Sequence, residues 1–314
     1  MGTQEFDVLA VGDGCLDVIL TGLDGSLEDS QVIHGCAQHV IPGGGFTTPV
    51  VLQRLGVKVT WAADFGSDMI STFIQKTAED EGVNLRYSRK LKRNARRISV
   101  SLSTLKNRSF LSYEDPNPLV PAAFRGLLQA NARVVYMPGS QLDKLFLLGA
   151  RIARRRKMTI IVDGNGADKY RIDQPVVKRC LQYIDILILN TDEVISITGN
   201  NTPETALSSL AVLSKIVVMK DGANGALFIE NGKIYRVPSI PVDAVDTTGA
   251  GDNFNAGFIA AWLKNKRLIE CVAWGNITAG LSTTVPGGAT MKTCMDDILS
   301  KLNYFPAMEK GREL

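Results

Sequence analysis

Short apolar runs alternate with amphipathic segments through the first two thirds of this 314-residue chain. Continuous apolar runs are typical of strands buried on both faces, and amphipathic segments between them are typical of crossover helices. The pattern therefore predicts an α/β fold with a doubly wound, mostly parallel sheet. Strands are expected at 6–11, 57–63, 134–137, 159–162, 184–189 and 216–219, and helices at 69–81, 142–156, 175–182 and 203–213.

The order of elements changes after residue 219. Two short β-rich runs, 225–230 and 233–237, flank Asn231-Gly232, which is a strong hairpin signal because both residues tolerate positive φ. Helices are then expected at 250–263, 269–284 and 295–302. Because no internal repeat or long linker divides the chain, we expect residues 1–314 to form a single domain.

Two pairs of short strands do not fit the alternation of strand and helix. We interpret them as antiparallel insertions, at about 16–41 and 96–114, that form a small β-sheet lid. A lid of this kind excludes water from a cleft. The alternatives are that these strands extend the main sheet or form an oligomer contact. The strands are expected at 16–21, 37–41, 97–105 and 109–113, with a turn at Lys106-Asn107-Arg108.

Charge and cysteine usage exclude several classes of protein. The 35 basic and 32 acidic residues give a net charge of +3, which is too even a balance for a dedicated nucleic-acid binder. No run of ~18 apolar residues predicts a membrane span. The cysteines form no CxxC pair, so we expect reduced thiols, no zinc site and a cytoplasmic location. The possible ligands are Cys15, Cys36, Cys180, Cys271, Cys294, His34 and His39.

The run VDTTGAGDNFNAGF, residues 245–258, joins a glycine-rich turn, one acid and a helix start. The backbone N–H groups of Gly249, Ala250 and Gly251 are expected to converge at the positive end of the helix dipole and form an anion hole. Asp252 falls in the first helical turn, where a carboxylate can take a proton from a hydroxyl held above the turn. The arrangement indicates phosphoryl transfer; the alternative is an ordinary capped helix N-terminus.

The longer pattern DTTGAGDxFxAGF closely resembles the C-terminal signature of the ribokinase-like (PfkB) carbohydrate kinases. The resemblance implies that Asp252 is the catalytic base and that Gly249, Ala250 and Gly251 supply the anion hole. It also places Asp246 and Thr248 where members of the family often bind a monovalent cation such as K⁺, although dependence on the ion varies across the family.

A second match to the family follows the first strand, in the run VGDGCLDV. Asp13 and Asp17 fall at the carboxyl end of that strand, where open α/β sheets hold their ligands. In ribokinase-like enzymes an acidic residue here binds sugar hydroxyls, which makes Asp17 the first candidate and Asp13 the second. The alternative for either residue is a solvated turn cap. A dinucleotide fingerprint is rejected because the third glycine is absent.

The run PGGGFTTPVVLQRLG, residues 42–56, resembles the family's first signature, a Gly-Gly turn that enters a helix. Gly43 and Gly44 would let the backbone come close to the substrate. Thr47 replaces the usual substrate-binding Asn, and one hydroxyl offers less than an amide's paired donor and acceptor. The preferred acceptor is therefore expected to differ from ribose.

Three further segments resemble parts of the nucleotide and magnesium sites. Asn190 and Glu193 match the family's NxxE element, which helps position Mg²⁺; the alternative is a helix cap. The family's turn beside ATP is matched by Lys220, Gly222 and Gly225. Lys220 replaces the small hydroxyl residue that is usual there. Asn276 falls at a position that can line the adenine pocket, and 285–289 resembles the turn at the nucleotide site.

The resemblance implies an ATP-dependent kinase that phosphorylates a sugar or related polyol with Mg²⁺, and a homodimer formed through the lid. The first alternative is a nucleoside kinase for adenosine-like substrates, and the second is a non-catalytic sugar- or nucleotide-binding regulatory protein. A sugar phosphate would need extra cations near the lid, and the alternative for these side chains is a solvated face. The available cations are Lys92, Arg93, Arg96, Arg97 and Arg108.

Overall fold

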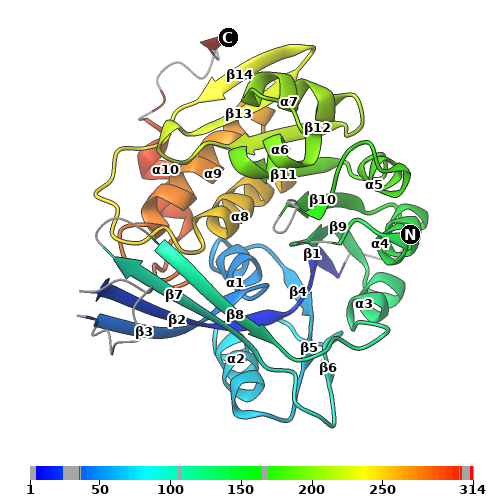
Figure 1. The fold of residues 1–314 in the computed structure, drawn as a ribbon, viewed down its shortest axis with the longest axis vertical. Coiled ribbons are helices and arrows are strands. Elements are labelled where there is room, and N and C mark those ends of the chain that lie inside the picture. Colours follow the sequence, from blue (N-terminus) through cyan, green and yellow to red (C-terminus); the bar gives the residue numbers. More distant parts are fainter. Residues whose placement is uncertain are drawn as a thin grey trace.

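A sheet of nine strands runs through the centre of the molecule (Figure 1). The computed structural model describes residues 5–23, 35, 37–104, 108–139, 141–164, 169–303, 305 and 312–313. The strand order is β15-β14-β13-β12-β11-β10-β9-β1-β4, parallel from β12 to β4 and antiparallel from β12 to β15. The strands are β1 (Phe6–Val11), β4 (Val59–Ala62), β9 (Ala132–Met137), β10 (Thr159–Asp163), β11 (Ile186–Asn190), β12 (Ile216–Lys220), β13 (Ala226–Glu230), β14 (Lys233–Val237) and β15 (Arg312–Glu313).

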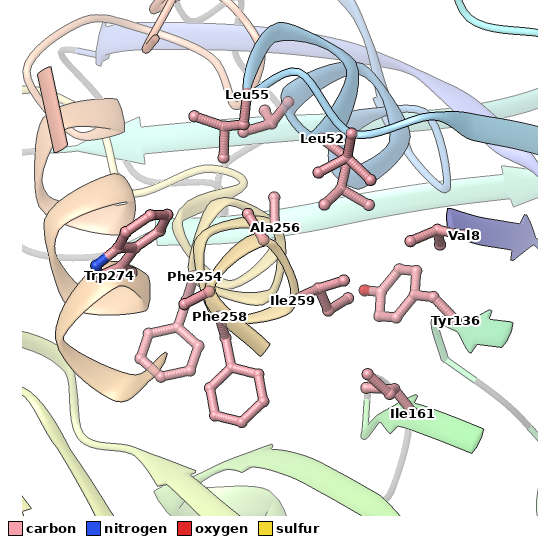
Figure 2. Packing of buried hydrophobic residues seen from close by; sticks show 14 of the residues in the cluster. Val8, Leu52, Leu55, Tyr136, Ile161, Phe254, Ala256, Phe258, Ile259 and Trp274 are labelled. Carbon is pink, nitrogen blue, oxygen red and sulfur yellow. The ribbon is translucent and has the colours of Figure 1, made fainter. Parts of the chain in front are cut away.

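Helices cover both faces of this sheet. Figure 2 shows side chains of α1, α9 and the sheet around α8, whose Phe254 and Ile259 are buried. The first layer holds α1 (Thr47–Arg54), α2 (Met69–Asp80), α8 (Ala250–Leu263), α9 (Leu268–Ser282) and α10 (Met295–Leu302). The second holds α3 (Ala123–Gln129), α4 (Lys144–Arg155), α5 (Pro175–Leu181), α6 (Thr191–Thr198) and α7 (Pro203–Ala211). The predicted doubly wound fold is confirmed.

The expected elements of the main sheet and its helices lie within two residues of the observed bounds, because continuous apolar strands and amphipathic helices are strong local signals. Shorter elements were not expected. These are α3, the edge strand β15, a 3-10 turn (Gly222–Asn224), and a two-stranded sheet of β5 (Asp64–Phe65) and β6 (Arg89–Lys90). Within the described residues, no helix has the length and hydrophobicity that crossing a bilayer requires.

The lid is a separate four-stranded sheet in the order β3-β2-β7-β8 (Figure 1). It does not extend the main sheet, which decides against that alternative. The expected antiparallel pairs β2–β3 and β7–β8 are present, but a parallel pair, β2–β7, joins them. Leu105, Lys106, Asn107, His34 and Cys36 lie outside the described residues. The strands are β2 (Gly14–Leu23), β3 (Ala37–Gly44), β7 (Arg97–Thr104) and β8 (Arg108–Glu114).

The two faces of the lid differ in character. On one face Ile41 packs so closely on Gly287 that a Cβ at that glycine would clash with it. The opposite face is apolar across all four strands, because residues paired in register lie on the same side. Its side chains include Val40, Leu111 and Tyr113, which are about half exposed. The first face therefore closes on the body, and the second faces outward.

Candidate active site

The glycine-rich turn expected at the start of α8 is present. Gly249 is the N-cap in a left-handed conformation (φ 70°) and lies directly against Gly288, where a Cβ would clash. The amide of Ala250 donates to the Thr247 carbonyl at 3.2 Å, and the first full helical bond runs from Asn253 to Gly249. The amides of Gly251 and Asp252 precede that bond, at positions where backbone donors have no partner inside the helix. This first turn can therefore hold an anion through the amides of Gly251 and Asp252. The expected set was Gly249, Ala250 and Gly251, and the expectation for Ala250 was wrong because Thr247 already accepts from its amide.

Two buried side chains fix the turn. Asn253 donates from Nδ2 to the carbonyls of Gly249 (2.9 Å) and Gly288 (2.6 Å). Asp246 accepts from the amide and hydroxyl of Thr248 at 3.0 and 2.7 Å, and from the Gly287 amide at 2.8 Å. The turn before α8 is thereby tied to the segment that follows α9. A role for Asp246 and Thr248 toward a monovalent cation stays a prediction.

Asp252 is partly buried and has few donors. Among the described residues, Thr48 is the one donor to its carboxylate, over a long 3.5 Å, and the same hydroxyl lies 3.2 Å from the Asp252 main-chain oxygen. Burial raises the pKa of Asp252 to about 7; the Asp163 and Asp17 carboxylates also raise it, and Lys220 opposes them. A carboxylate with this pKa is well matched to take a proton near neutral pH.

Lys220 and Asp163 form a buried ion pair beside this turn, at the carboxyl ends of β12 and β10. Lys220 Nζ lies 3.1 Å from Asp163 Oδ1, and 3.1 Å from the position that a Cβ on Gly251 would take. Burial by itself would lower the pKa of Lys220, but the Asp163 and Glu193 carboxylates outweigh it and raise the pKa. A permanent positive charge therefore stands beside the anion-holding turn.

Sequence reasoning missed Asp163 and three residues that connect it to Asp252. Asn255 donates to Asp163 Oδ2 at 2.7 Å and to the Tyr136 hydroxyl at 3.0 Å, and Thr48 Oγ1 lies 3.3 Å from the same hydroxyl. The one local signal was an acid at the end of a buried parallel strand, where ligands are held. The other three residues come from elements far apart in the sequence.

The residues expected to bind the acceptor differ in their contacts and in their burial. Asp17 lies against Gly43, where a Cβ would clash with Oδ2, and Cys15 donates from Sγ to Oδ1 at 3.1 Å. Gly44 has a positive φ of 58°. Thr47 is 1% exposed and packs beside Gly288. Asp17 therefore lies beside the turn at Gly43 and Gly44.

Asp13 has different surroundings from Asp17. Its Oδ2 pairs with Arg97 Nη2 at 2.8 Å, and its Oδ1 accepts from the Asp64 amide at 2.6 Å. Its main-chain oxygen accepts from the Gly45 amide at 3.1 Å. Asp13 therefore connects the end of β1 with Arg97 of the lid and with Gly45, which follows the turn at Gly43 and Gly44.

Asn190 and Glu193 form the capping box of α6. Each side chain accepts from the other residue's amide at 2.8 Å, as the helix-cap alternative expects. Burial, together with Asp163, raises the pKa of Glu193. Glu193 Oε2 lies 2.9 Å from the position of a Cβ on Gly164, so the carboxylates of Glu193 and Asp163 flank that glycine. Carboxylate oxygens are suitable ligands for a Mg²⁺ ion that keeps several of its waters.

Two of the residues expected at the nucleotide, Gly225 and Asn276, meet at the end of β14, whereas Lys220 pairs with Asp163. Gly222 and Gly225 both have positive φ, and a Cβ at Gly225 would clash with the Val237 carbonyl. Asn276 donates to the carbonyls of Val237 (3.0 Å) and Pro238 (2.9 Å). The structure thus gathers Gly225 and Asn276 at one place, and their contacts with a nucleotide stay predictions.

Known proteins are similar to this chain in sequence and in fold. The pfkB family of carbohydrate kinases matches residues 6–294. Ribokinase from Haemophilus influenzae is 25% identical over 282 residues, which are 83% of this chain and 87% of that protein. From the same organism, 2-dehydro-3-deoxygluconokinase is 28% identical over 215 residues, 63% and 67% of the two chains.

The solved structure of Arabidopsis thaliana ribokinase complexed with ribose and ATP superposes with a TM-score of 0.81 at 23% identity, covering 95% of this chain and 98% of that one. At this identity the likeness shows the fold. The family match spans nearly the whole described sheet and both signature turns. The chain therefore belongs to the pfkB family of carbohydrate kinases.

Proposed function

We propose that this protein transfers the γ-phosphoryl group of ATP to a hydroxyl of a sugar or related polyol, with Asp252 as the general base. The observation that carries the proposal is the position of this carboxylate: it has a pKa of about 7 and stands in the same helical turn as two amides that precede the first helical bond. A base and an anion hole on one turn are what phosphoryl transfer to an alcohol requires.

In the proposed reaction Asp252 accepts the proton of the acceptor hydroxyl. The hydroxyl oxygen forms a bond to the γ-phosphorus while the bond from that phosphorus to the bridging oxygen breaks, and ADP leaves with the electron pair. The amides of Gly251 and Asp252 and the ammonium group of Lys220 lie where they can stabilise charge on the transferred group. Asp17 is proposed to accept hydrogen bonds from acceptor hydroxyls.

Glu193 and Asp163 are the carboxylates proposed to hold a hydrated Mg²⁺, because they flank Gly164 next to Lys220. When bound to the phosphates, Mg²⁺ neutralises their charge. Within the described residues no group of three His, Cys, Asp or Glu side chains suits a metal ion, so an ion here would keep several waters. A monovalent cation such as K⁺ near Asp246 is a further proposal.

A homodimer through the lid is proposed from the outward apolar face that carries Val40, Leu111 and Tyr113. An exposed apolar sheet face is typical of an interaction surface. Light scattering of the purified protein at several concentrations tests this proposal. Leu111→Arg should shift the mass toward the monomer, and a wild-type protein that is monomeric at all concentrations contradicts it.

Phosphotransfer with purified protein, ATP and Mg²⁺ tests the proposed function. The acceptors are D-ribose, D-fructose, sugar acids, sugar phosphates and adenosine, and the measurements are ADP release and the mass of the product. A product heavier by one phosphoryl group supports the proposal. Preference for adenosine would make the protein a nucleoside kinase, and no turnover with any acceptor would favour a non-catalytic binding protein.

A further inference from the structure

Two neighbouring arginines at the root of the lid form ion pairs of opposite character. Arg97, the first residue of β7, is 8% exposed and pairs with Asp13 at 2.8 Å; it also donates to Asn117 Oδ1. Arg96 pairs with Asp115 through both carboxylate oxygens, but its side chain is 41% exposed. One pair is therefore enclosed and the other is open to solvent.

Arg97 lies on the acceptor-facing side of the lid. Ser99 is opposite Asp17 in the β2–β7 register, and residues two apart in a strand share a face. Arg97 and Asp17 therefore share one face of the sheet. Asp13 also accepts from the amide of Gly45, in the glycine turn that supports Asp17. The enclosed pair thus borders the space where the acceptor is proposed to bind.

Among the described residues, the buried cations at this border are already paired with carboxylates. Arg97 is matched by Asp13 and Lys220 by Asp163, and the carboxylate of Asp252 lies near that second pair. Among the other lid cations whose side chains are described, Arg96 is matched by Asp115 and the remaining two are exposed. Those two are Lys92 and Arg93. Within the part of the chain that the structure describes, a carboxylate or phosphate on the acceptor would therefore find each buried cation already matched and would approach the carboxylate of Asp252.

We propose that Asp13 sets acceptor specificity: by neutralising Arg97 it restricts the site to uncharged sugars and polyols and excludes acceptors that carry a carboxylate or phosphate group near the lid. This inference rests on the proposed kinase function and names its substrate class. Asp13 acts through Arg97 and is a specificity residue rather than a catalytic one. The role differs from direct binding of sugar hydroxyls, for which the family resemblance makes Asp13 the second candidate after Asp17.

Matched acceptors test the proposal. D-fructose and 2-keto-D-gluconate differ at C1, where one carries CH₂OH and the other a carboxylate, and D-ribose, D-fructose 6-phosphate and 2-dehydro-3-deoxy-D-gluconate extend both classes. For the wild type, kcat/KM should favour the best uncharged acceptor over the best anionic one by about tenfold or more, the size of one charge interaction in a partly buried site. A wild type that prefers an anionic acceptor overturns the proposal.

Asp13→Asn keeps an oxygen for the Asp64 amide but leaves Arg97 without its negative partner. The ratio of kcat/KM between uncharged and anionic acceptors should fall by about tenfold or more. Asp115→Asn is the matched control, because it releases the exposed Arg96 and should leave the ratio unchanged. A folded Asp13→Asn protein with the wild-type ratio, or an equal change in the control, contradicts the proposal.

Arg97→Gln gives an independent readout if Asp13→Asn does not fold, as judged by circular dichroism. It leaves Asp13 as an added negative charge, so the ratio should move further toward uncharged acceptors. An unchanged ratio, or a move toward anionic acceptors, overturns the proposal. Turnover restricted to anionic acceptors refutes this inference and leaves the kinase function intact, whereas no turnover with either class refutes both.

Discussion

Asp246 and Asp252 flank the turn at Gly249–Gly251 in the sequence, but their carboxylates differ in the number of hydrogen bonds that they accept. Asp246 is 8% exposed and accepts three hydrogen bonds between 2.7 and 3.0 Å from Thr248 and Gly287. Within the described part of the chain, the carboxylate of Asp252 accepts one long hydrogen bond at 3.5 Å, and burial together with neighbouring carboxylates raises its pKa to about 7. The supply of donors separates them: the first carboxylate braces the loop, and the second is left able to bind a proton.

The strongest test of this contrast is Asp252→Asn. It removes the proposed base, so kcat should fall by about 10³-fold or more, while the dissociation constant for ATP changes little. Rapid-quench kinetics and ATP titration measure the two quantities. Wild-type kcat on the true acceptor would show that Asp252 is not the base.

The same variant has a second readout in stability. A raised pKa in the folded protein means that the charged carboxylate opposes folding above about pH 7, and that this cost disappears below about pH 4, where both folded and unfolded forms are protonated. The Tm of Asp252→Asn should therefore be equal to or above that of the wild type at pH 8, with the difference lost in acid. A lower Tm at pH 8 would place Asp252 with Asp246 as a structural brace.

Lys220→Met changes the charge beside Asp252. It removes a cation from the proposed phosphoryl site, so kcat should fall by about 10²-fold. Wild-type kcat/KM should decline about tenfold per pH unit below about pH 7, because protonated Asp252 cannot act as a base. Loss of Lys220 should move this decline to higher pH. Lys215→Met, at an exposed lysine, is the control, and an identical pH profile in both variants contradicts the assignment.

Asp246→Asn tests the other half of the contrast. The amide cannot accept from every donor that the carboxylate satisfies, and the loss of a charge-assisted bond costs about 1–3 kcal/mol. Tm should fall and KM for ATP should rise by about tenfold, whereas kcat should fall far less than in Asp252→Asn. The exposed Asp243 offers the control Asp243→Asn. A kcat loss as large as that of Asp252→Asn, with unchanged Tm, would break the distinction.

Thr48→Val gives the smallest expected change. The Thr48 hydroxyl lowers the pKa of Asp252, so its removal should raise that pKa. The decline of kcat/KM in acid should therefore begin about half a pH unit higher. Thr48→Ser keeps the hydroxyl and should retain the wild-type profile. A shift toward lower pH in Thr48→Val would mean that Thr48 does not support the charged form of Asp252.

Local patterns were sufficient for the main fold and for one half of the site. Buried parallel strands read as continuous apolar runs, and the turn from Gly249 to Asp252 lies in one contiguous motif. The β2–β7 pair was not predictable, because a parallel pair between distant strands leaves no local signal. Short α3 was missed for a related reason, since one or two helical turns carry little periodicity.

Tertiary contacts decide the rest of the site. Thr48, Tyr136, Asp163 and Asn255 meet only after four separate elements have packed, so no spacing in the sequence connects them. The same holds for the pairing of Asp13 with Arg97, which gives this acid different surroundings from those of Asp17. Charge pairing across the fold, rather than residue type, distinguishes the two acids.

The contact between Ile41 of the lid and Gly287 has a thermodynamic consequence. Gly287 donates to Asp246 and so belongs to the segment that steadies the start of α8. A ligand held beneath the lid and a ligand held at the start of α8 would therefore both act on the segment that contains Gly287. If either ligand shifts this element, linkage requires that each changes the other's affinity by the same factor, so the order of addition alters the rates but never the final occupancy.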